Sequence, residues 1–367
     1  MRTTVPHQAT GLLDAPTSPD GLAGVPLAVE PTGRKDFVSD QEVRWCPGCG
    51  DYTILSALQS VLPQLGVKRE NTVVISGIGC SSRLPYYMNS YGMHSIHGRA
   101  LTLATGLAAT REDLAVFVVT GDGDALSIGA NHLVHALRRN VNLTILLFNN
   151  RIYGLTKGQY SPTSPVGAMT KSSPAGSVDA PLNPMSLALG AEATFVARAL
   201  DADKAGLTAT IGAAARHRGA SFVEIYQNCA VFNDGAYGAL RGPEGAEAVI
   251  RLRAGEPILF GHDDHLGVVA DGSGGVRVVE VAEVGLDEIL VHDPAIDDPS
   301  RAFALSRLTA AGEMDRAPVG VFRDVERPVH DDLVREHVRR EQASYDGDPA
   351  SDEALAALIA GPDTWRA

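Results

Sequence analysis

Four cysteines are the residues of this chain with the clearest chemical potential. Cys46 and Cys49 form a Cys-x-x-Cys pair beside proline and glycine, whereas Cys80 and Cys229 stand far along the chain, each close to a glycine or asparagine. A [4Fe–4S] cluster needs four thiolate ligands, and a Cys-x-x-Cys turn can present two of them to one metal centre. One cluster is therefore a candidate, with structural zinc and free buried thiols as the alternatives.

A second pattern predicts a magnesium–diphosphate site. Gly121-Asp122-Gly123 is followed along the chain by Asn149-Asn150. Mg²⁺ prefers six oxygen ligands and often combines carboxylates with phosphate oxygens. Asp122 can supply a carboxylate oxygen, Asn150 an amide oxygen and Ile152 a backbone carbonyl. Each motif alone is a common turn, but the pair at successive strand ends favours a functional site.

Strands and helices must alternate around these motifs. Apolar periodicity predicts helices near 51–65 (capped by Asp51), 99–110, 127–139, 184–189 and 202–218, and strands at 72–76, 114–120, 143–148, 193–197 and 221–226. This alternation predicts an α/β fold with a doubly wound parallel sheet, in which ligands bind beyond the carboxyl ends of strands. Four motifs directly follow a predicted strand: Gly77-Ile78-Gly79-Cys80, Gly121-Asp122-Gly123, Asn149-Asn150 and Asn228-Cys229.

The chain divides into three expected regions. Residues 1–36 are rich in Pro, Gly, Thr and Asp and are interpreted as a flexible N-terminal arm. Residues 37–230 form the core domain, which includes a Gly/Ser/Thr/Pro-rich loop of about 30 residues after Asn150, a length usually functional or disordered. Residues 231–367 are expected to be an extension packed on the core, with short strands over 256–295, a turn at 271–275 and a helix over 329–345.

Composition narrows the partners and the compartment. The formal net charge is −13, which argues against nucleic acid as a partner because nucleic-acid binding usually needs a basic face. No run of 18 apolar residues or secretory signal is evident, so we expect a cytoplasmic protein without a membrane span. In a reducing cytoplasm, cysteines are more often metal ligands than disulfides.

Three segments resemble the β subunits of 2-oxoacid:ferredoxin oxidoreductases: Trp45-Cys-Pro-Gly-Cys-Gly50, Gly77-Ile-Gly-Cys-Ser81 and the run from Asn149 to Thr163. The resemblance extends over roughly residues 36–325, includes Val291-His292-Asp293, and is strongest for the bacterial two-subunit 2-oxoglutarate enzymes. It implies the thiamine diphosphate-binding fold.

The same resemblance implies roles for individual residues. It places Ile78, Gly79, Cys80, Ser81, His97, Gly123, Gly154 and Leu155 against thiamine diphosphate, with Ser82 as a further candidate. It makes Cys46, Cys49, Cys80 and Cys229 the ligands of one [4Fe–4S] cluster, and Asp122, Asn150 and the Ile152 carbonyl the Mg²⁺ ligands. Lys157 is then the cation that could attract CoA phosphates or the acid carboxylate. Zinc fits less well, because structural zinc sites usually gather their ligands in two close pairs.

The implied activity is CoA-dependent oxidative decarboxylation of a 2-oxoacid, best matched by 2-oxoglutarate giving succinyl-CoA and CO₂, with electrons passed through the cluster to ferredoxin. Thiamine diphosphate enzymes also need a glutamate from a second α/β domain, for which this chain has no room. We therefore expect an α subunit, an (αβ)₂ assembly and no activity from this chain alone. The alternatives are a pyruvate-specific enzyme, a non-oxidative thiamine diphosphate decarboxylase or lyase subunit, and a non-enzymatic electron-transfer subunit.

Overall fold

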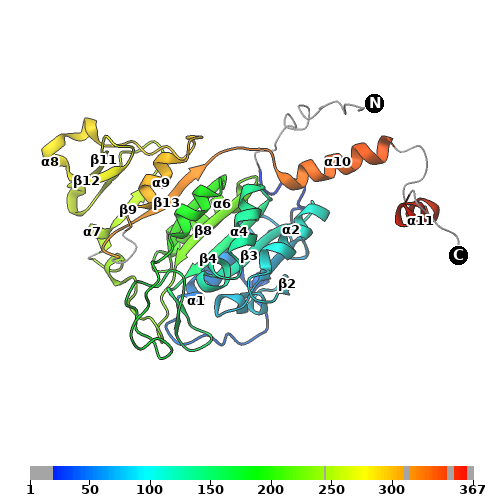
Figure 1. Cartoon of the computed structure of the whole chain (residues 1–367), viewed down its shortest axis with the longest axis horizontal. Helices are drawn as coiled ribbons and strands as arrows, with labels where there is room; N and C mark the ends of the chain where they lie inside the picture. The colour runs from blue at the N-terminus through cyan, green and yellow to red at the C-terminus, as the bar shows by residue number, and fades with distance from the viewer. Residues whose placement is uncertain (1–19, 244, 310–313, 345–350, 362–367) are drawn as a thin grey trace.

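An eight-stranded sheet forms the centre of the computed structural model, which describes residues 20–243, 245–309, 314–344 and 351–361 (Figure 1). The strand order is β2-β1-β3-β4-β8-β7-β13-β9, and every neighbouring pair is parallel except β13 and β7. The strands are β1 (Thr72–Ser76), β2 (Tyr91–His94), β3 (Ala115–Gly121), β4 (Leu143–Asn149), β7 (Phe195–Leu200), β8 (Ala220–Tyr226), β9 (Val249–Leu252) and β13 (Ala317–Asp324).

Helices cover both faces of this sheet, which confirms the doubly wound α/β prediction (Figure 1). Alternate residues of β1 show the two layers: Val73 and Ile75 pack into one apolar cluster and Val74 into the other. The first layer holds α2 (Ala100–Thr110), α4 (Ala130–Arg138), α5 (Pro184–Gly190) and α9 (Ser300–Ser306), and the second holds α1 (Asp51–Leu65) and α6 (Lys204–Arg216). Side chains of a central strand therefore have partners on both sides.

The other α-helices and strands lie outside the eight-stranded sheet. A small antiparallel sheet contains β10 (Leu259–Phe260), β11 (Leu266–Ala270) and β12 (Val276–Glu280), with the expected turn over 271–275. The remaining elements are α3 (Asp122–Leu126), β5 (Ile152–Tyr153), β6 (Gln159–Tyr160), α7 (Gly245–Ala248), α8 (Val281–Val284), α10 (His330–Ser344) and α11 (Asp352–Ala360). No helix among the described residues has the length and apolarity needed to cross a bilayer.

The C-terminal part is more closely joined to the core than an extension lying on its surface. Its strands β9 and β13 belong to the central sheet, and β13 runs antiparallel to β7, so the sheet is mainly but not wholly parallel. A buried ion pair supports the junction: Arg198 Nε on β7 lies 2.7 Å from Glu224 Oε2 on β8, and Arg198 Nη1 also donates to the Pro318 carbonyl of β13.

Three local predictions also need correction. Residues 20–36 are not an arm apart from the core, because Gly21 donates its N–H to the Arg216 carbonyl and Leu27 pairs with Val67; residues 1–19 lie outside the described part. Asp51 is the first residue of α1, not its cap, and its carboxylate is buried beside Cys49. The helix expected over 127–139 is α4, which begins only at Ala130, and a separate helix, α3, precedes it because the backbone leaves the helical region at Ser127.

Buried His292 predicts a pH dependence of stability. Burial lowers the pKa of His292, and its Nε2 lies 2.7 Å from the Val321 carbonyl of β13. Below about pH 6.5 the unfolded chain binds a proton at this histidine that the folded chain resists, so stability falls with decreasing pH, by at most about 1.4 kcal/mol per pH unit. In denaturant titrations at about pH 5 and about pH 7.5, H292Q should lose less stability on acidification than the parent chain. An equal loss in both would contradict this assignment.

Candidate cofactor and cluster site

The four motifs that follow strands lie at the ends of β1, β3, β4 and β8, which are consecutive neighbours in the central sheet. Because these strands are parallel, their carboxyl ends meet at one edge, as the strand-end rule predicts. A cavity of about 520 Å³ opens there. Its wall contains all eight residues expected against thiamine diphosphate and all three expected Mg²⁺ ligands: Ile78, Gly79, Cys80, Ser81, His97, Asp122, Gly123, Asn150, Ile152, Gly154 and Leu155.

Asp122 is buried at the first residue of α3, directly after β3. The hydroxyls of Ser161 and Thr163 each donate to its Oδ2 at 2.5 Å, which leaves the second oxygen without a hydroxyl partner. Burial raises the pKa of Asp122 to about 6, and the two hydroxyl hydrogen bonds oppose that rise. A buried carboxylate held at one oxygen suits a divalent cation, whose charge would offset the cost of burial.

Asn150 lies across the same cavity at the end of β4. Its Oδ1 accepts the Ile152 N–H at 3.1 Å, and its Nδ2 donates to Gln227 Oε1 at 2.8 Å. The amide is therefore oriented by its neighbours, with the oxygen on the Ile152 side. Asp122, Asn150 and Ile152 together offer the oxygen types that Mg²⁺ takes from proteins.

Asp124 organises the site, although the sequence prediction did not include it. Its Oδ1 accepts the N–H groups of Ile78 and Gly98 at 3.1 and 2.7 Å and lies 2.6 Å from His97 Nδ1. Its Oδ2 accepts the Thr120 hydroxyl. One carboxylate thus joins the turn after β1 to the turn before α2 and orients His97 toward the cavity wall.

Two features fit a diphosphate group in this cavity. The Ser81 hydroxyl is buried in the wall without a protein partner, as expected of a group that hydrogen-bonds a ligand. The second feature is Gly123, which has no side chain, so the wall there consists of its backbone and of Tyr153, which packs over it and donates its hydroxyl to the Gly123 carbonyl at 2.8 Å. A β-carbon at position 123 would lie 2.2 Å from Tyr153 Cε1.

Substituting Gly123 should therefore weaken cofactor binding. In G123A the tyrosine ring must move, and overpacking of this kind costs about 1–3 kcal/mol, enough for about a tenfold loss of thiamine diphosphate affinity. Calorimetric titration in the presence of Mg²⁺ measures the loss. G106A is the matched control, since a β-carbon at exposed Gly106 of α2 meets nothing within 4 Å and alanine favours the helix. Unchanged affinity in G123A would contradict this assignment.

The segments that carry the cysteines meet beside the cavity. Trp45 Nε1 donates to the Cys80 carbonyl at 2.7 Å, and the Gly50 N–H donates to the Asn228 carbonyl at 3.1 Å. Gly154 lies between two of the sulfurs, because a β-carbon there would be 3.5 Å from Cys80 Sγ and 3.6 Å from Cys229 Sγ. All four cysteines are free thiols, from exposed Cys46 to buried Cys229.

A single ion and a four-iron cluster make different demands on these thiols. Among the described residues, no group of three or more His, Cys, Asp or Glu side chains is placed to hold one metal ion, as zinc would require. In a four-iron cluster each thiolate binds a different iron, so the four sulfurs lie farther apart than they do around a single ion. Burial raises the pKa of the Cys80 thiol to about 12 and that of Cys49 further still. Both therefore stay protonated at neutral pH unless a metal centre binds them.

Two further candidates lie outside the cavity wall. Lys157 is exposed in the turn between β5 and β6, with φ at 75°, an uncommon value for a residue with a side chain. Its neighbours Leu155 and Thr156 do line the cavity. Ser82 is buried behind the Cys80 turn, where its carbonyl accepts the Ser76 hydroxyl.

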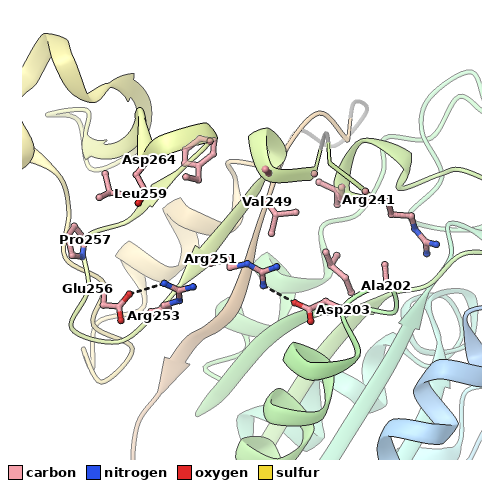
Figure 2. Close-up of a pocket in the computed structure, with 17 residues that line it drawn as sticks. Ala202, Asp203, Arg241, Val249, Arg251, Arg253, Glu256, Pro257, Leu259 and Asp264 are labelled. Atoms are coloured by element: carbon pink, nitrogen blue, oxygen red, sulfur yellow. Dashed lines mark hydrogen bonds and ion pairs between the residues drawn. The ribbon is translucent and has the colours of Figure 1, made fainter.

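A second, larger cavity of about 820 Å³ lies between the start of α6, β9 and the small sheet (Figure 2). Three arginines line it, but each is paired with a carboxylate: Arg241 with Asp201, Arg251 with Asp203 and Arg253 with Glu256. None of the predicted site residues lines this cavity. The smaller cavity at the strand ends is therefore the candidate site.

Comparison with known proteins shows which families this chain resembles. Residues 77–225 match the family described as thiamine pyrophosphate enzyme, C-terminal TPP binding domain. The chain is 61% identical over 343 residues to the 2-oxoglutarate oxidoreductase subunit KorB of Mycobacterium tuberculosis, covering 94% of this chain and 91% of that protein. It is 36% identical over 328 residues to the β subunit of 2-oxoacid:ferredoxin oxidoreductase 1 of Aeropyrum pernix, covering 88% and 91%.

A solved structure is also similar along almost the whole chain. It is the 2-oxoglutarate:ferredoxin oxidoreductase of Magnetococcus marinus with 2-oxoglutarate, coenzyme A and succinyl-CoA bound. The TM-score is 0.70 at 32% identity, and the alignment covers 91% of this chain and 97% of that one.

Proposed function

Because the chain belongs to the family of β subunits of 2-oxoacid:ferredoxin oxidoreductases, we propose that it works with an α subunit in the CoA-dependent oxidative decarboxylation of 2-oxoglutarate. The products are succinyl-CoA, CO₂ and reduced ferredoxin. One observation carries the proposal at the level of the site: Cys80 belongs both to the cysteine group and to the wall of the strand-end cavity.

The cavity residues divide the task of holding thiamine diphosphate. Asp122, Asn150 and the Ile152 carbonyl would hold Mg²⁺, whose charge would help bind the diphosphate, while Ser81 and His97 would contact the cofactor from the turns after β1 and before α2. Once bound, thiamine diphosphate supplies the electron sink for decarboxylation of a 2-oxoacid. Apolar Ile78 and Leu155 line the same wall and help exclude water from the reacting centre.

Cys46, Cys49, Cys80 and Cys229 would hold one [4Fe–4S] cluster. The turn Gly77-Ile78-Gly79-Cys80 brings Cys80 into the wall of the cavity, so a cluster bound to this thiolate would lie close to the thiamine diphosphate that donates electrons. Exposed Cys46 marks the side on which a ferredoxin can approach the cluster. The described residues supply no second set of four cysteines, so electrons must leave to another protein.

The α subunit would complete the active site. Family membership as a β subunit implies that partner, and we propose an (αβ)₂ assembly in which α brings the glutamate that protonates the cofactor and most of the substrate pocket. Exposed Ile78 and Leu155, at 44% and 48%, lie on the rim where such a partner would cover the cavity.

Lys157 would act on the CoA side of this site. It projects from an exposed turn whose neighbours line the cavity, and its ammonium can pair with a phosphate or carboxylate without leaving water. We expect K157A to raise the KM for CoA several-fold with little change in iron content. An unchanged KM would remove Lys157 from the site.

The test is to co-express both subunits anaerobically and measure CoA-dependent reduction of ferredoxin with 2-oxoglutarate and with pyruvate. We expect activity with 2-oxoglutarate only, and none from either subunit alone. Activity with pyruvate only would show that the substrate is pyruvate and not 2-oxoglutarate, while the class of enzyme would stand. CO₂ release without iron and without an electron acceptor would establish the non-oxidative alternative.

A further inference from the structure

Gln227 joins the two parts of the site. It directly follows β8 and is 1% exposed. On one side its Oε1 accepts Asn150 Nδ2 at 2.8 Å, and on the other its Nε2 donates to Cys49 Sγ at 3.3 Å. A single side chain therefore contacts a candidate Mg²⁺ ligand and a candidate cluster ligand.

The orientation of this amide follows from its surroundings. The Asn228 carbonyl can only accept a hydrogen bond, and it lies within hydrogen-bond distance of Gln227 Nε2, so the nitrogen must be on that side, together with Cys49. Across the pair, the Ile152 N–H fixes Asn150 Oδ1, which turns Asn150 Nδ2 toward Gln227 Oε1. The Asn228 carbonyl and the Ile152 N–H thus fix the direction of both hydrogen bonds: Asn150 donates to Gln227, and Gln227 donates to the sulfur of Cys49.

We propose that Gln227 is a positioning residue for both cofactors: its N–H raises the reduction potential of the cluster through Cys49, and its carbonyl holds Asn150 for Mg²⁺. This inference rests on the proposed function, which supplies the cluster and the metal.

The expected sign follows from charge. A cluster becomes more negative on reduction, and an N–H directed at a ligand sulfur stabilises that negative charge. Burial strengthens the effect, because little water competes in this low-dielectric region. Removing the N–H should therefore make the cluster harder to reduce, and electron transfer from the cofactor site less favourable.

Two substitutions separate the two contacts. Q227L removes both the donor to Cys49 and the acceptor for Asn150. Q227E keeps an oxygen that Asn150 can donate to, but loses the donor and places a carboxylate beside the sulfur. Q59L is the matched control, since Gln59 of α1 is also buried and also links two partners: it accepts a hydrogen bond from Arg34 and donates one to the Tyr87 carbonyl at 3.1 Å, and neither partner is a predicted ligand.

The experiment uses the anaerobic αβ enzyme and two measurements besides activity. An EPR-monitored redox titration gives the cluster potential, and titration of the cofactor-stripped enzyme with Mg²⁺ at saturating thiamine diphosphate gives the metal midpoint. In Q227L and Q227E the reduction equilibrium should move toward the oxidised cluster by about tenfold, or about 59 mV for one electron. The Mg²⁺ midpoint should rise about tenfold in Q227L and stay near the parent value in Q227E.

Unchanged potentials in both variants would overturn the proposal, as would an equal shift in Q59L. A parent enzyme without a cluster EPR signal would instead defeat the proposed function, so the two failures are distinguishable.

Discussion

Replacing Cys229 with serine should abolish ferredoxin reduction, to less than about 1% of the parent rate, while thiamine diphosphate still binds. The reason is that a cubane cluster needs thiolate ligands, and a serine hydroxyl is a hard, weakly acidic substitute. Cys229 is the informative position because, unlike Cys80, it does not line the cofactor cavity. Iron analysis and EPR of the reduced enzyme measure the loss of the cluster, a ferredoxin-reduction assay measures the activity, and cofactor titration measures thiamine diphosphate binding.

The control is V231S, which introduces a serine two residues from Cys229. Val231 is 56% exposed, so V231S should keep about four irons per αβ unit and near-parent activity. Retention of a full [4Fe–4S] signal by C229S would show that Cys229 is not a ligand. Loss of thiamine diphosphate binding in C229S would show that the two sites are not separable in this way.

Replacing Asp122 with asparagine should have the second large effect. It should weaken Mg²⁺ and thiamine diphosphate binding and leave the cluster intact, which is the reverse of the effect of C229S. The variant keeps the shape of the side chain but removes the negative charge opposite Mg²⁺. The Mg²⁺ midpoint for thiamine diphosphate binding should rise about 100-fold and activity should fall to a similar extent, whereas iron content stays unchanged. Metal titration followed by calorimetry or circular dichroism measures the midpoint.

Asp113 supplies the matched control for this charge change. It is partly exposed just before β3 and pairs with Arg111 at the surface, so D113N should leave the metal midpoint unchanged. A midpoint in D122N within twofold of the parent value would contradict the assignment of Asp122 as a ligand.

The central strands were predictable because their apolar runs are local patterns ended by glycine or asparagine. β1, β3, β4 and β8 fall within a few residues of their expected bounds, and the motifs that follow them lie along one edge. Because ligands bind beyond the carboxyl ends of parallel strands, the position of each motif directly after a strand is enough to predict the site, without knowing which motifs are in contact.

The edges of the sheet were not predictable in the same way. β2 is exposed along its whole length and so has no apolar pattern, and β13 joins β7 from more than a hundred residues away. Asp51 was expected to cap α1 because aspartate commonly does so, but Gly50 occupies that position and the Asp51 carboxylate is buried. Such outcomes depend on packing that a local pattern does not contain.

In the site, the expected ligands were predictable from the sequence, but the residues that hydrogen-bond to them were not. The expected ligands have recognisable types and spacings, whereas Asp124, Ser161, Thr163 and Gln227 act through hydrogen bonds to other residues. Asp124 had one detectable signal, the second aspartate of Gly121-Asp-Gly-Asp124. Gln227 had none, because its role depends on Cys49 and Asn150 meeting in space.

The central claim is that the cofactor cavity and the cysteine group form one electron-transfer unit. The most direct measurement mixes the anaerobic αβ enzyme with 2-oxoglutarate, without ferredoxin, and follows the cluster by EPR while CO₂ is collected. We predict a reduced-cluster signal that grows with CO₂ release in the parent enzyme and grows about 100-fold more slowly in D122N. CO₂ release at the parent rate with a cluster that stays oxidised, even after CoA is added, would contradict the claim.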